Sequence, residues 1–174
     1  MRLMRRKIDD FLKEWKENED RLPLIVKGAR QIGKTASIMQ FANDNYRNVV
    51  AINFVLQQKF KSIFDDGYDV DSIVRNITLI DPSIELEPGN TIFFFDEMQD
   101  CPVCATSLKA FKIDGRYDVV CSGSLMGINY QEIESNSVGY KEDYTMHSMD
   151  FEEFLWAKGY DSAFVERLFE KMVS

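Results

Sequence analysis

The stretch GARQIGKT, residues 28–35, decides the fold class of this chain. It fits the pattern G-x-x-x-x-G-K-[ST] at each defined position and ends on Lys34 and Thr35. An apolar run, LPLIV (residues 22–26), comes before it, and apolar residues at helical spacing come after it. This context predicts a phosphate-binding loop, because glycines let the backbone wrap closely around phosphates and turn successive N–H groups inward.

The loop provides the first set of candidate site residues. Lys34 would reach the β- and γ-phosphates of a nucleotide, and Thr35 would be a ligand of Mg²⁺. The N-terminus of the following helix would add backbone donors and its positive dipole end. A chance glycine-rich turn with a solvated lysine is the alternative, which the flanking strand and helix disfavour. The predicted nucleotide contacts are Gly28, Ala29, Arg30, Gln31, Ile32, Gly33, Lys34, Thr35 and Ala36.

A second motif, TIFFFDEMQD (residues 91–100), joins an apolar strand to an acidic end. Asp96 at the strand tip would hold Mg²⁺ through water, because this cation favours oxygen ligands and keeps much of its hydration shell. Glu97 would orient and polarise the attacking water. An acidic turn after a buried strand is the alternative, and the glycine-rich motif argues against it. Gln99 and Asp100 are less specific and are assigned no more than a capping role.

The strand DVVCSGS, residues 118–124, ends in small polar residues. Such an end fits a sensor position near a γ-phosphate, with Ser122 and Ser124 as the candidate groups. A plain junction between strand and turn explains the same residues equally well, so both interpretations stay open.

The cysteines raise the question of metal or redox chemistry. Cys101 and Cys104 form a C-P-V-C pair, and Cys121 with the single histidine, His147, would complete a set of four ligands. The spacing matches no zinc module, and the pair falls where a helix should begin. We therefore favour structural thiols.

Hydrophobic patterning predicts alternating helices and strands. Helices are expected over residues 5–17, around 38–42, around 70–77 and over 102–112. Strands are expected over residues 22–26, 48–54, 91–95 and 117–122. This alternation favours right-handed crossovers and an α/β fold, with a parallel sheet between helices. We interpret residues 127–144 as loop-rich, and FEEFLWA and FVERLFEKMV as two final helical pieces.

Composition and charge exclude several classes of function. The chain has 174 residues, of which 45% are hydrophobic, enough for one domain with a core. The net charge is −8, although the first 30 residues carry nine basic and six acidic side chains. Duplex DNA would require the opposite balance, so nucleic-acid binding by this chain alone is not expected. No apolar run approaches the roughly 20 residues that cross a membrane. Three cysteines make no disulfide framework, which predicts a cytoplasmic location.

Further segments give the chain a resemblance to a known family: SLKAF, CSGSLMG, SVGYKEDY and DFEEFLWAKG. With the two nucleotide motifs, they make it resemble the prokaryotic AAA-like ATPases of the AAA_14 type, which usually carry a C-terminal domain called DUF4143. Shared features include Arg-Gln just before Gly-Lys-Thr, an acidic pair followed by Gln, and a Phe-Glu-Glu-Phe-Leu segment. The resemblance covers nearly all of residues 5–160.

The resemblance implies an additional-strand P-loop ATPase core, in which the sensor strand lies between the strands that carry Walker A and Walker B. It implies ATP as the nucleotide, the roles given above for the loop and the acidic pair, and a sensor turn that contains Ser124. Arg30 matches a family hallmark. Residues 1–150 would form the ATPase domain, and residues 151–174 the helical start of a truncated C-terminal domain.

Two departures from the family pattern affect the site. Gly139-Tyr140 stands where relatives often have glycine and a basic residue, with Lys141 one place later, so a γ-phosphate sensor there is in doubt. Ser148 replaces the usual proline before the Phe-Glu-Glu-Phe-Leu segment.

The main hypothesis is a slow Mg²⁺-dependent ATPase coupled to a missing C-terminal module. An arginine finger would come from self-association or from an unknown protein partner. The alternatives are a nucleotide-regulated interaction switch and an ATPase whose DNA contacts lie in the absent domain.

Overall fold

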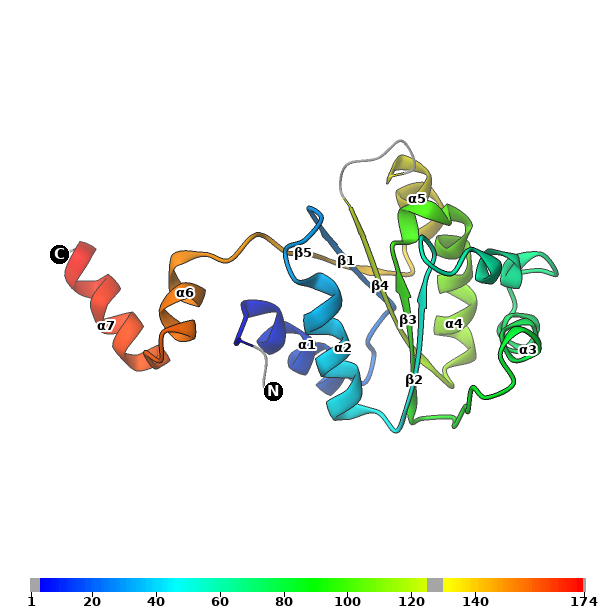
Figure 1. The fold of residues 1–174 in the computed structure, drawn as a ribbon, viewed down its shortest axis with the longest axis horizontal. Helices are drawn as coiled ribbons and strands as arrows, with labels where there is room; N and C mark the ends of the chain where they lie inside the picture. Colours follow the sequence, from blue (N-terminus) through cyan, green and yellow to red (C-terminus); the bar gives the residue numbers. More distant parts are fainter. Residues whose placement is uncertain (1–3, 125–129, 174) are drawn as a thin grey trace.

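The computed structural model describes residues 4–124 and 130–173. Its centre is a parallel sheet of five strands in the order β2-β3-β4-β1-β5 (Figure 1). As the resemblance implies, β4, the predicted sensor strand, lies between β1 and β3, the strands that carry the two predicted nucleotide motifs. The strands are β1 Leu24–Gly28, β2 Asn48–Asn53, β3 Thr91–Asp96, β4 Asp118–Ser124 and β5 Glu142–Thr145.

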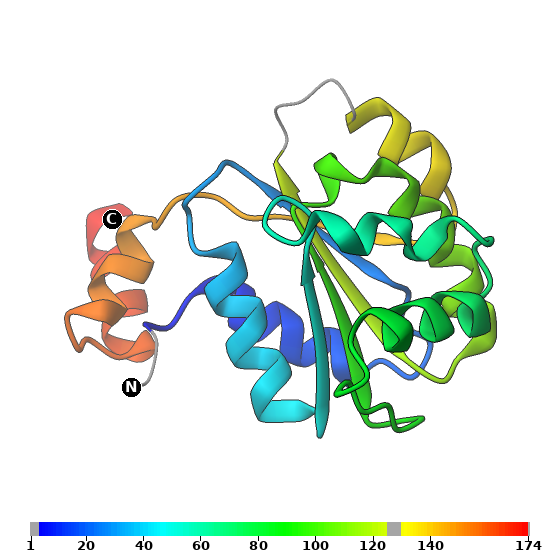
Figure 2. The same ribbon diagram turned by 45° about the vertical axis from the view of Figure 1, so that its right-hand side comes forward.

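Helices cover both faces of the sheet, which confirms the predicted α/β class. Figure 2 shows α1 and α2 on one side, and α3, α4 and α5 on the other. The helices are α1 Lys7–Glu17, α2 Lys34–Asn45, α3 Val70–Ile80, α4 Leu108–Asp114, α5 Tyr130–Ser137, α6 Phe151–Ala157 and α7 Ser162–Val173. Short 3-10 helices are η1 Gln58–Phe64, η2 Met98–Asp100 and η3 Pro102–Ser107.

Side chains of the apolar strands alternate between two cores. On β3, Ile92 and Phe94 pack with α1 and α2, whereas Phe93 and Phe95 pack with η1, α3, η3 and α4. Because both faces are buried, β3 is apolar at successive positions. Such a run of successive apolar residues predicts a central strand.

The interpretation of residues 127–144 as loop-rich is wrong for the part that the structure describes. This part contains α5 and the edge strand β5, while residues 125–129, including Leu125 of the sensor turn, lie outside the described residues. β5 pairs with β1 along its whole length, and the Lys27 ammonium lies 3.1 Å from the Asp143 carboxylate. The sequence of β5 is polar and does not predict a strand, and pairing with β1 stabilises it.

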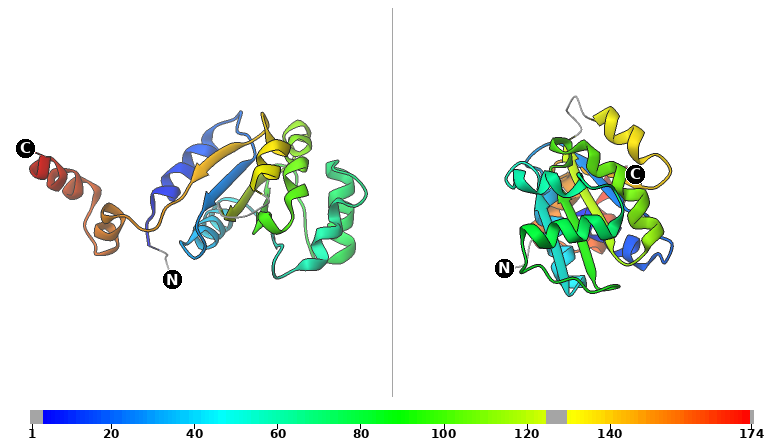
Figure 3. Two further views of the ribbon diagram at one scale, coloured as in Figure 1. Left: turned by 90° about the horizontal axis from the view of Figure 1, so that it is seen from above. Right: turned by 90° about the vertical axis from the view of Figure 1, so that its right-hand side faces the viewer.

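The helices α6 and α7 project away from the sheet, past the edge that β5 forms (Figures 1 and 3). Asp150 caps the N-terminus of α6, and its carboxylate accepts a hydrogen bond of 2.8 Å from the Glu153 amide. Both helices expose large apolar side chains, Phe151 and Phe154 on α6 and Phe164 on α7, and Tyr160 between the two helices is exposed as well. Within residues 4–124 and 130–173, no helix has the length and apolar character needed to cross a membrane.

Candidate functional site

The glycine-rich loop, residues 28–35, runs from the end of β1 into the first turn of α2. Two of its residues have positive φ angles, 62° at Gln31 and 96° at Gly33. A Cβ on Gly28 would lie 2.5 Å from the carbonyl oxygen of Met146, so only glycine fits beside this neighbour. The motif glycines therefore stand where the backbone turns sharply or is closely packed.

Lys34 lies within the curve of this loop, with its side chain buried. Its ammonium donates hydrogen bonds to the carbonyl oxygens of Gly28, at 3.0 Å, and Ala29, at 2.5 Å. Removal from water lowers the pKa of Lys34, and the nearby carboxylates of Glu97 and Asp96 partly oppose this shift. The loop thus holds the Lys34 ammonium beside the acidic end of β3.

Thr35 and Asp96 meet as the sequence predicts. The Thr35 hydroxyl donates to the Asp96 carboxylate at 2.8 Å, and the Ser122 hydroxyl donates to the other carboxylate oxygen. The backbone amide of Glu97 also donates to Asp96, at 2.9 Å. Three elements, α2, β3 and β4, therefore converge on one buried carboxylate.

This donor set fits Mg²⁺. The ion takes oxygen ligands, and nucleotide enzymes bind it through one or two carboxylates together with phosphates and water. Thr35 offers a hydroxyl and Asp96 a carboxylate at adjacent positions. Among the described residues, no three His, Cys, Asp or Glu side chains gather into a metal cage, so the remaining ligands would come from nucleotide and water. Bound there, Mg²⁺ would neutralise charge on the phosphates.

Glu97 is held in an unusual backbone conformation, with a φ angle of 55°. Its carboxylate accepts a hydrogen bond from the side-chain amide of Gln99, and the amide oxygen of Gln99 accepts one from the Ser124 backbone at 3.3 Å. A Cβ on Gly123 would lie 3.2 Å from that same oxygen. Gln99 thus links the acidic pair to the end of β4.

The expectation that Gln99 only caps the next helix is therefore wrong, because Gln99 lies inside η2 and its buried side chain contacts β4. Ser124 contributes a backbone amide to this network, while Ser122 contributes its hydroxyl to Asp96. A sequence signal existed, since Gln99 follows the acidic pair closely, but the β4 contact depends on the fold.

Arg30 and Glu97 line one hollow of about 390 Å³ at the carboxyl end of the sheet. Gln31, Asn53 and Asp100 line it too. Arg30 and Ala36 are exposed, and Ile32 is half-buried. Of the predicted loop contacts, Arg30 and Gln31 therefore line this open space together with Glu97.

Lys141 lies away from this site. It directly precedes β5, whose first residue pairs with Leu24 at the start of β1, whereas the loop follows the end of β1. Its ammonium forms an ion pair with Asp143. The doubt about a basic sensor at this position is supported by that placement.

The cysteines lie in the core that contains α4. Burial raises the pKa of the Cys101 thiol to about 11 and that of Cys104 well above its usual value. Cys104 also interacts with Cys121, while His147 is exposed on the chain after β5. Buried thiols of raised pKa are poor nucleophiles and poor metal ligands, which agrees with a structural role.

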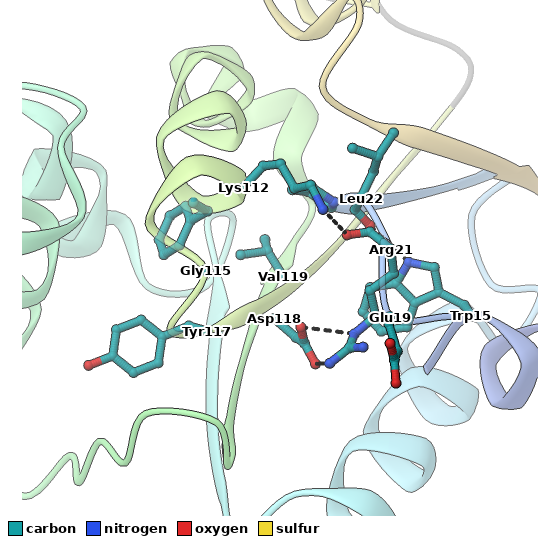
Figure 4. A pocket seen from close by; sticks show the side chains of 11 residues that line it. Trp15, Glu19, Arg21, Leu22, Lys112, Gly115, Tyr117, Asp118 and Val119 are labelled. Atoms are coloured by element: carbon teal, nitrogen blue, oxygen red, sulfur yellow. Dashed lines mark hydrogen bonds and ion pairs between the residues drawn. The ribbon is translucent and has the colours of Figure 1, made fainter. Parts of the chain in front are cut away.

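A smaller pocket, of about 130 Å³, lies at the opposite, amino-terminal end of the sheet (Figure 4). Arg21 forms two hydrogen bonds to Asp118 there, at 2.9 and 3.0 Å. The ammonium of Lys112 donates to the carbonyl oxygens of Asp20 and Arg21. Arg21 and Asp118 in this pocket are thus paired with each other, and no predicted site residue lines it.

Comparison with known proteins identifies the family. The sequence profile of AAA_14, described as an AAA domain, matches residues 20–155. The chain belongs to the AAA_14 family. The match spans both motifs and the end of β4, so this AAA domain contains the whole site described above.

Individual relatives are distant. A Haemophilus influenzae protein, named only as uncharacterized, is 24% identical over 154 residues. The match covers 86% of this chain but only 36% of that protein, so the AAA domain corresponds to a minor part of its relative.

Two solved structures are similar at low identity. PCH-2 of C. elegans is 14% identical with a TM-score of 0.48, and the match covers 82% of this chain and 42% of PCH-2. AMPPCP-bound DnaA of Aquifex aeolicus is 14% identical with a TM-score of 0.45, with 77% and 44% covered. The assignment of the AAA domain rests on the family match.

Proposed function

We propose that this AAA domain binds Mg-ATP at the glycine-rich loop and hydrolyses it slowly, coupling nucleotide state to a C-terminal module. One observation carries the proposal: the Thr35 hydroxyl lies 2.8 Å from the Asp96 carboxylate. The loop and the acidic pair are more than 60 positions apart in the sequence, and an Mg-nucleotide site requires them together.

Each residue would have a distinct task in hydrolysis. Backbone N–H groups of the loop and the Lys34 ammonium would bind phosphate oxygens. Thr35 and Asp96 would hold the cation. Glu97, fixed by Gln99, would orient the attacking water and accept its proton. Ser124 would report the state of the γ-phosphate through the end of β4.

Residues 1–150 would form the ATPase domain, and residues 151–174 the start of the following module. Efficient turnover would need an arginine from a second copy or from another protein, because transition-state charge requires a further cation. The acidic balance argues against direct binding of nucleic acid by this chain. We also propose a cytoplasmic location, because the three cysteines are free thiols.

Phosphate release from Mg-ATP over a range of protein concentrations tests this proposal, with Glu97→Gln measured in parallel. We expect turnover per molecule to rise with concentration and to vanish in Glu97→Gln, while ATP binding persists. Equal turnover in the two proteins would contradict the role of Glu97. Unchanged Mg-ATP affinity in Lys34→Ala would contradict the site itself.

A nucleotide-regulated switch is the second candidate. This candidate follows if the hydrogen bond from Gln99 to the Glu97 carboxylate keeps Glu97 from activating water instead of orienting it for catalysis. Binding of a protein partner that depends on ATP, without turnover at any protein concentration, would support the switch over the ATPase.

A further inference from the structure

Arg6 connects the glycine-rich loop to the C-terminal helices, although it belongs to neither. It directly precedes α1, and Asp9 fixes its backbone by accepting a hydrogen bond from its amide at 2.8 Å. The guanidinium then donates in three directions: to the Ile32 carbonyl at 2.9 Å, the His147 carbonyl at 3.0 Å and the Glu153 carboxylate at 2.9 Å. These partners lie in the loop, after β5 and in α6.

The contact to Ile32 bears directly on phosphate binding. Ile32 directly precedes Gly33, whose φ angle is 96°, and a Cβ on Gly33 would lie 3.1 Å from the Arg6 guanidinium. By holding the Ile32 carbonyl, Arg6 fixes the orientation of the peptide that joins Ile32 to Gly33. The N–H of that same peptide belongs to the loop that would bind phosphate. Arg6 is thus placed to set the direction of a loop donor.

Glu153 in turn fixes Arg6. The side chains of Arg6 and Glu153 are 10% and 7% exposed, and the same carboxylate oxygen also accepts the Lys7 amide at 2.8 Å. A buried pair holds its geometry because an unpaired charge there is costly. Since Glu153 lies in the first turn of α6, the orientation of the loop and the position of α6 depend on one guanidinium.

We propose that Arg6 is a positioning residue for the glycine-rich loop and that the Arg6–Glu153 pair couples nucleotide binding to the placement of α6. This inference rests on the proposed function, because it assumes that the loop binds nucleotide. Arg6 lies outside residues 20–155, to which the family profile applies. By linkage, a pair that links the two sites must transmit effects in both directions.

Hydrogen exchange without nucleotide tests the positioning role first, on the full chain. Arg6→Gln with Glu153→Gln removes both charges, so that neither charge is left buried without its counterion. Lys7→Gln is the matched control, because Lys7 also bonds to the start of α6, at 2.6 Å from Asp150, and its partners in the described part of the chain, Asp150, Glu152 and Glu153, all lie outside the loop. We expect faster amide exchange over residues 29–35 in the double variant and unchanged exchange in the control, with circular dichroism showing both proteins folded.

Nucleotide titration then tests the coupling, with Mg-ADP as the probe. We expect the double variant to bind about 5- to 150-fold more weakly, the usual range of coupling between sites, and Lys7→Gln to stay within about twofold. Mg-ADP should also slow exchange over residues 151–157 in the unaltered chain and not in the double variant. Wild-type affinity and wild-type loop exchange in a folded double variant would overturn the inference.

Lys34→Ala distinguishes a failure of the role inferred for Arg6 from a failure of the proposed function. If the unaltered chain and Lys34→Ala bind Mg-ADP equally, the nucleotide site is wrong and the coupling falls with it, whereas the exchange data still decide whether Arg6 positions the loop. If Lys34→Ala loses binding while the double variant keeps it, only the coupling is wrong. If Arg6→Gln alone does not fold, the double variant and Glu153→Gln alone still decide the outcome.

Discussion

Two aspartates lie at opposite ends of the sheet, and their surroundings differ. Asp118 begins β4, where Arg21 forms two hydrogen bonds to it and the Tyr46 hydroxyl a third. Asp96 ends β3, where the hydroxyls of Thr35 and Ser122 and a backbone amide donate to it. One carboxylate has an arginine of the chain as its counterion, while the other is held by neutral donors.

The difference separates a carboxylate that the fold itself neutralises from one that we propose to bind a metal ion. The charge of Asp118 is satisfied within the fold, and the same contact with burial raises the pKa of the Tyr46 phenol. The hydrogen bonds to Asp96 leave its charge to be balanced by Lys34 nearby and, in our proposal, by Mg²⁺. A buried acidic group at the carboxyl end of a parallel sheet is therefore informative mainly when its partners are neutral.

Asp96→Asn should give the largest effect, on turnover. Loss of a metal-binding carboxylate removes several kcal/mol of transition-state stabilisation, so phosphate release should fall roughly 10²-fold or more. The free energy of unfolding should change little, because the asparagine oxygen can accept from Ser122 and the Glu97 amide, while its NH2 group can donate to the Thr35 hydroxyl oxygen. Turnover within twofold of the unaltered chain would contradict the proposed role of Asp96 in binding Mg²⁺.

Asp118→Asn should show the reverse pattern. Arg21 and Tyr46 would lose a charged acceptor in a half-buried place, which costs about 2 kcal/mol of unfolding free energy. Mg-ATP affinity should not change. Asp114→Asn is the control, because the exposed Asp114 pairs with Arg116 at the surface and such surface pairs contribute at most about 1 kcal/mol. Denaturant unfolding measures the unfolding free energy of both variants. Equal decreases in the two variants would contradict a structural role of Asp118 beyond that of a surface pair.

Gln99→Ala tests the hydrogen bonds that Gln99 forms at the carboxyl end of the sheet. It removes the group that connects Glu97 to the Ser124 amide, so Glu97 would sample other positions. Loss of an orienting partner costs about 10- to 100-fold in activity, and we expect turnover to fall within this range while Mg-ATP affinity stays the same. An equal loss of affinity would instead indicate that Gln99 maintains the loop.

The smallest expected effect concerns pH. Burial lowers the pKa of Lys34 from its ordinary value of 10.5. As pH rises towards 10.5, the Lys34 ammonium therefore loses its proton before a free lysine would. Mg-ATP affinity should weaken over that range, whereas Lys34→Arg, which keeps its charge, should show no such decline. The sign for stability is opposite: the lowered pKa destabilises the folded chain below it, and this penalty fades as pH rises towards 10.5. A pH-independent affinity in the unaltered chain would contradict a phosphate contact by Lys34.

Sequence alone predicted the central strands and the residues of both nucleotide motifs, because those signals are local. Phe93 to Phe95 are buried on both faces, and Lys34 follows a glycine pattern of fixed spacing. The structure brings Thr35 and Asp96 together as predicted, while the nucleotide contacts themselves remain a prediction.

Long-range contacts explain what the sequence did not predict. β5 is a polar strand of four residues that depends on pairing with β1. Gln99 acquires its role only when the left-handed backbone at Glu97 turns η2 towards β4. Arg6 contacts Ile32, 26 positions away, and Glu153, 147 positions away, and no local pattern indicates such contacts.

ATP affinity measured with and without Mg²⁺ tests the central claim most directly, in the unaltered chain and in Asp96→Asn and Asp118→Asn. We predict that Mg²⁺ strengthens ATP binding by the unaltered chain and by Asp118→Asn, and that this gain is lost in Asp96→Asn. A gain of the same size in all three proteins, or no gain in any, would contradict the assignment of Thr35 and Asp96 as the metal-binding pair.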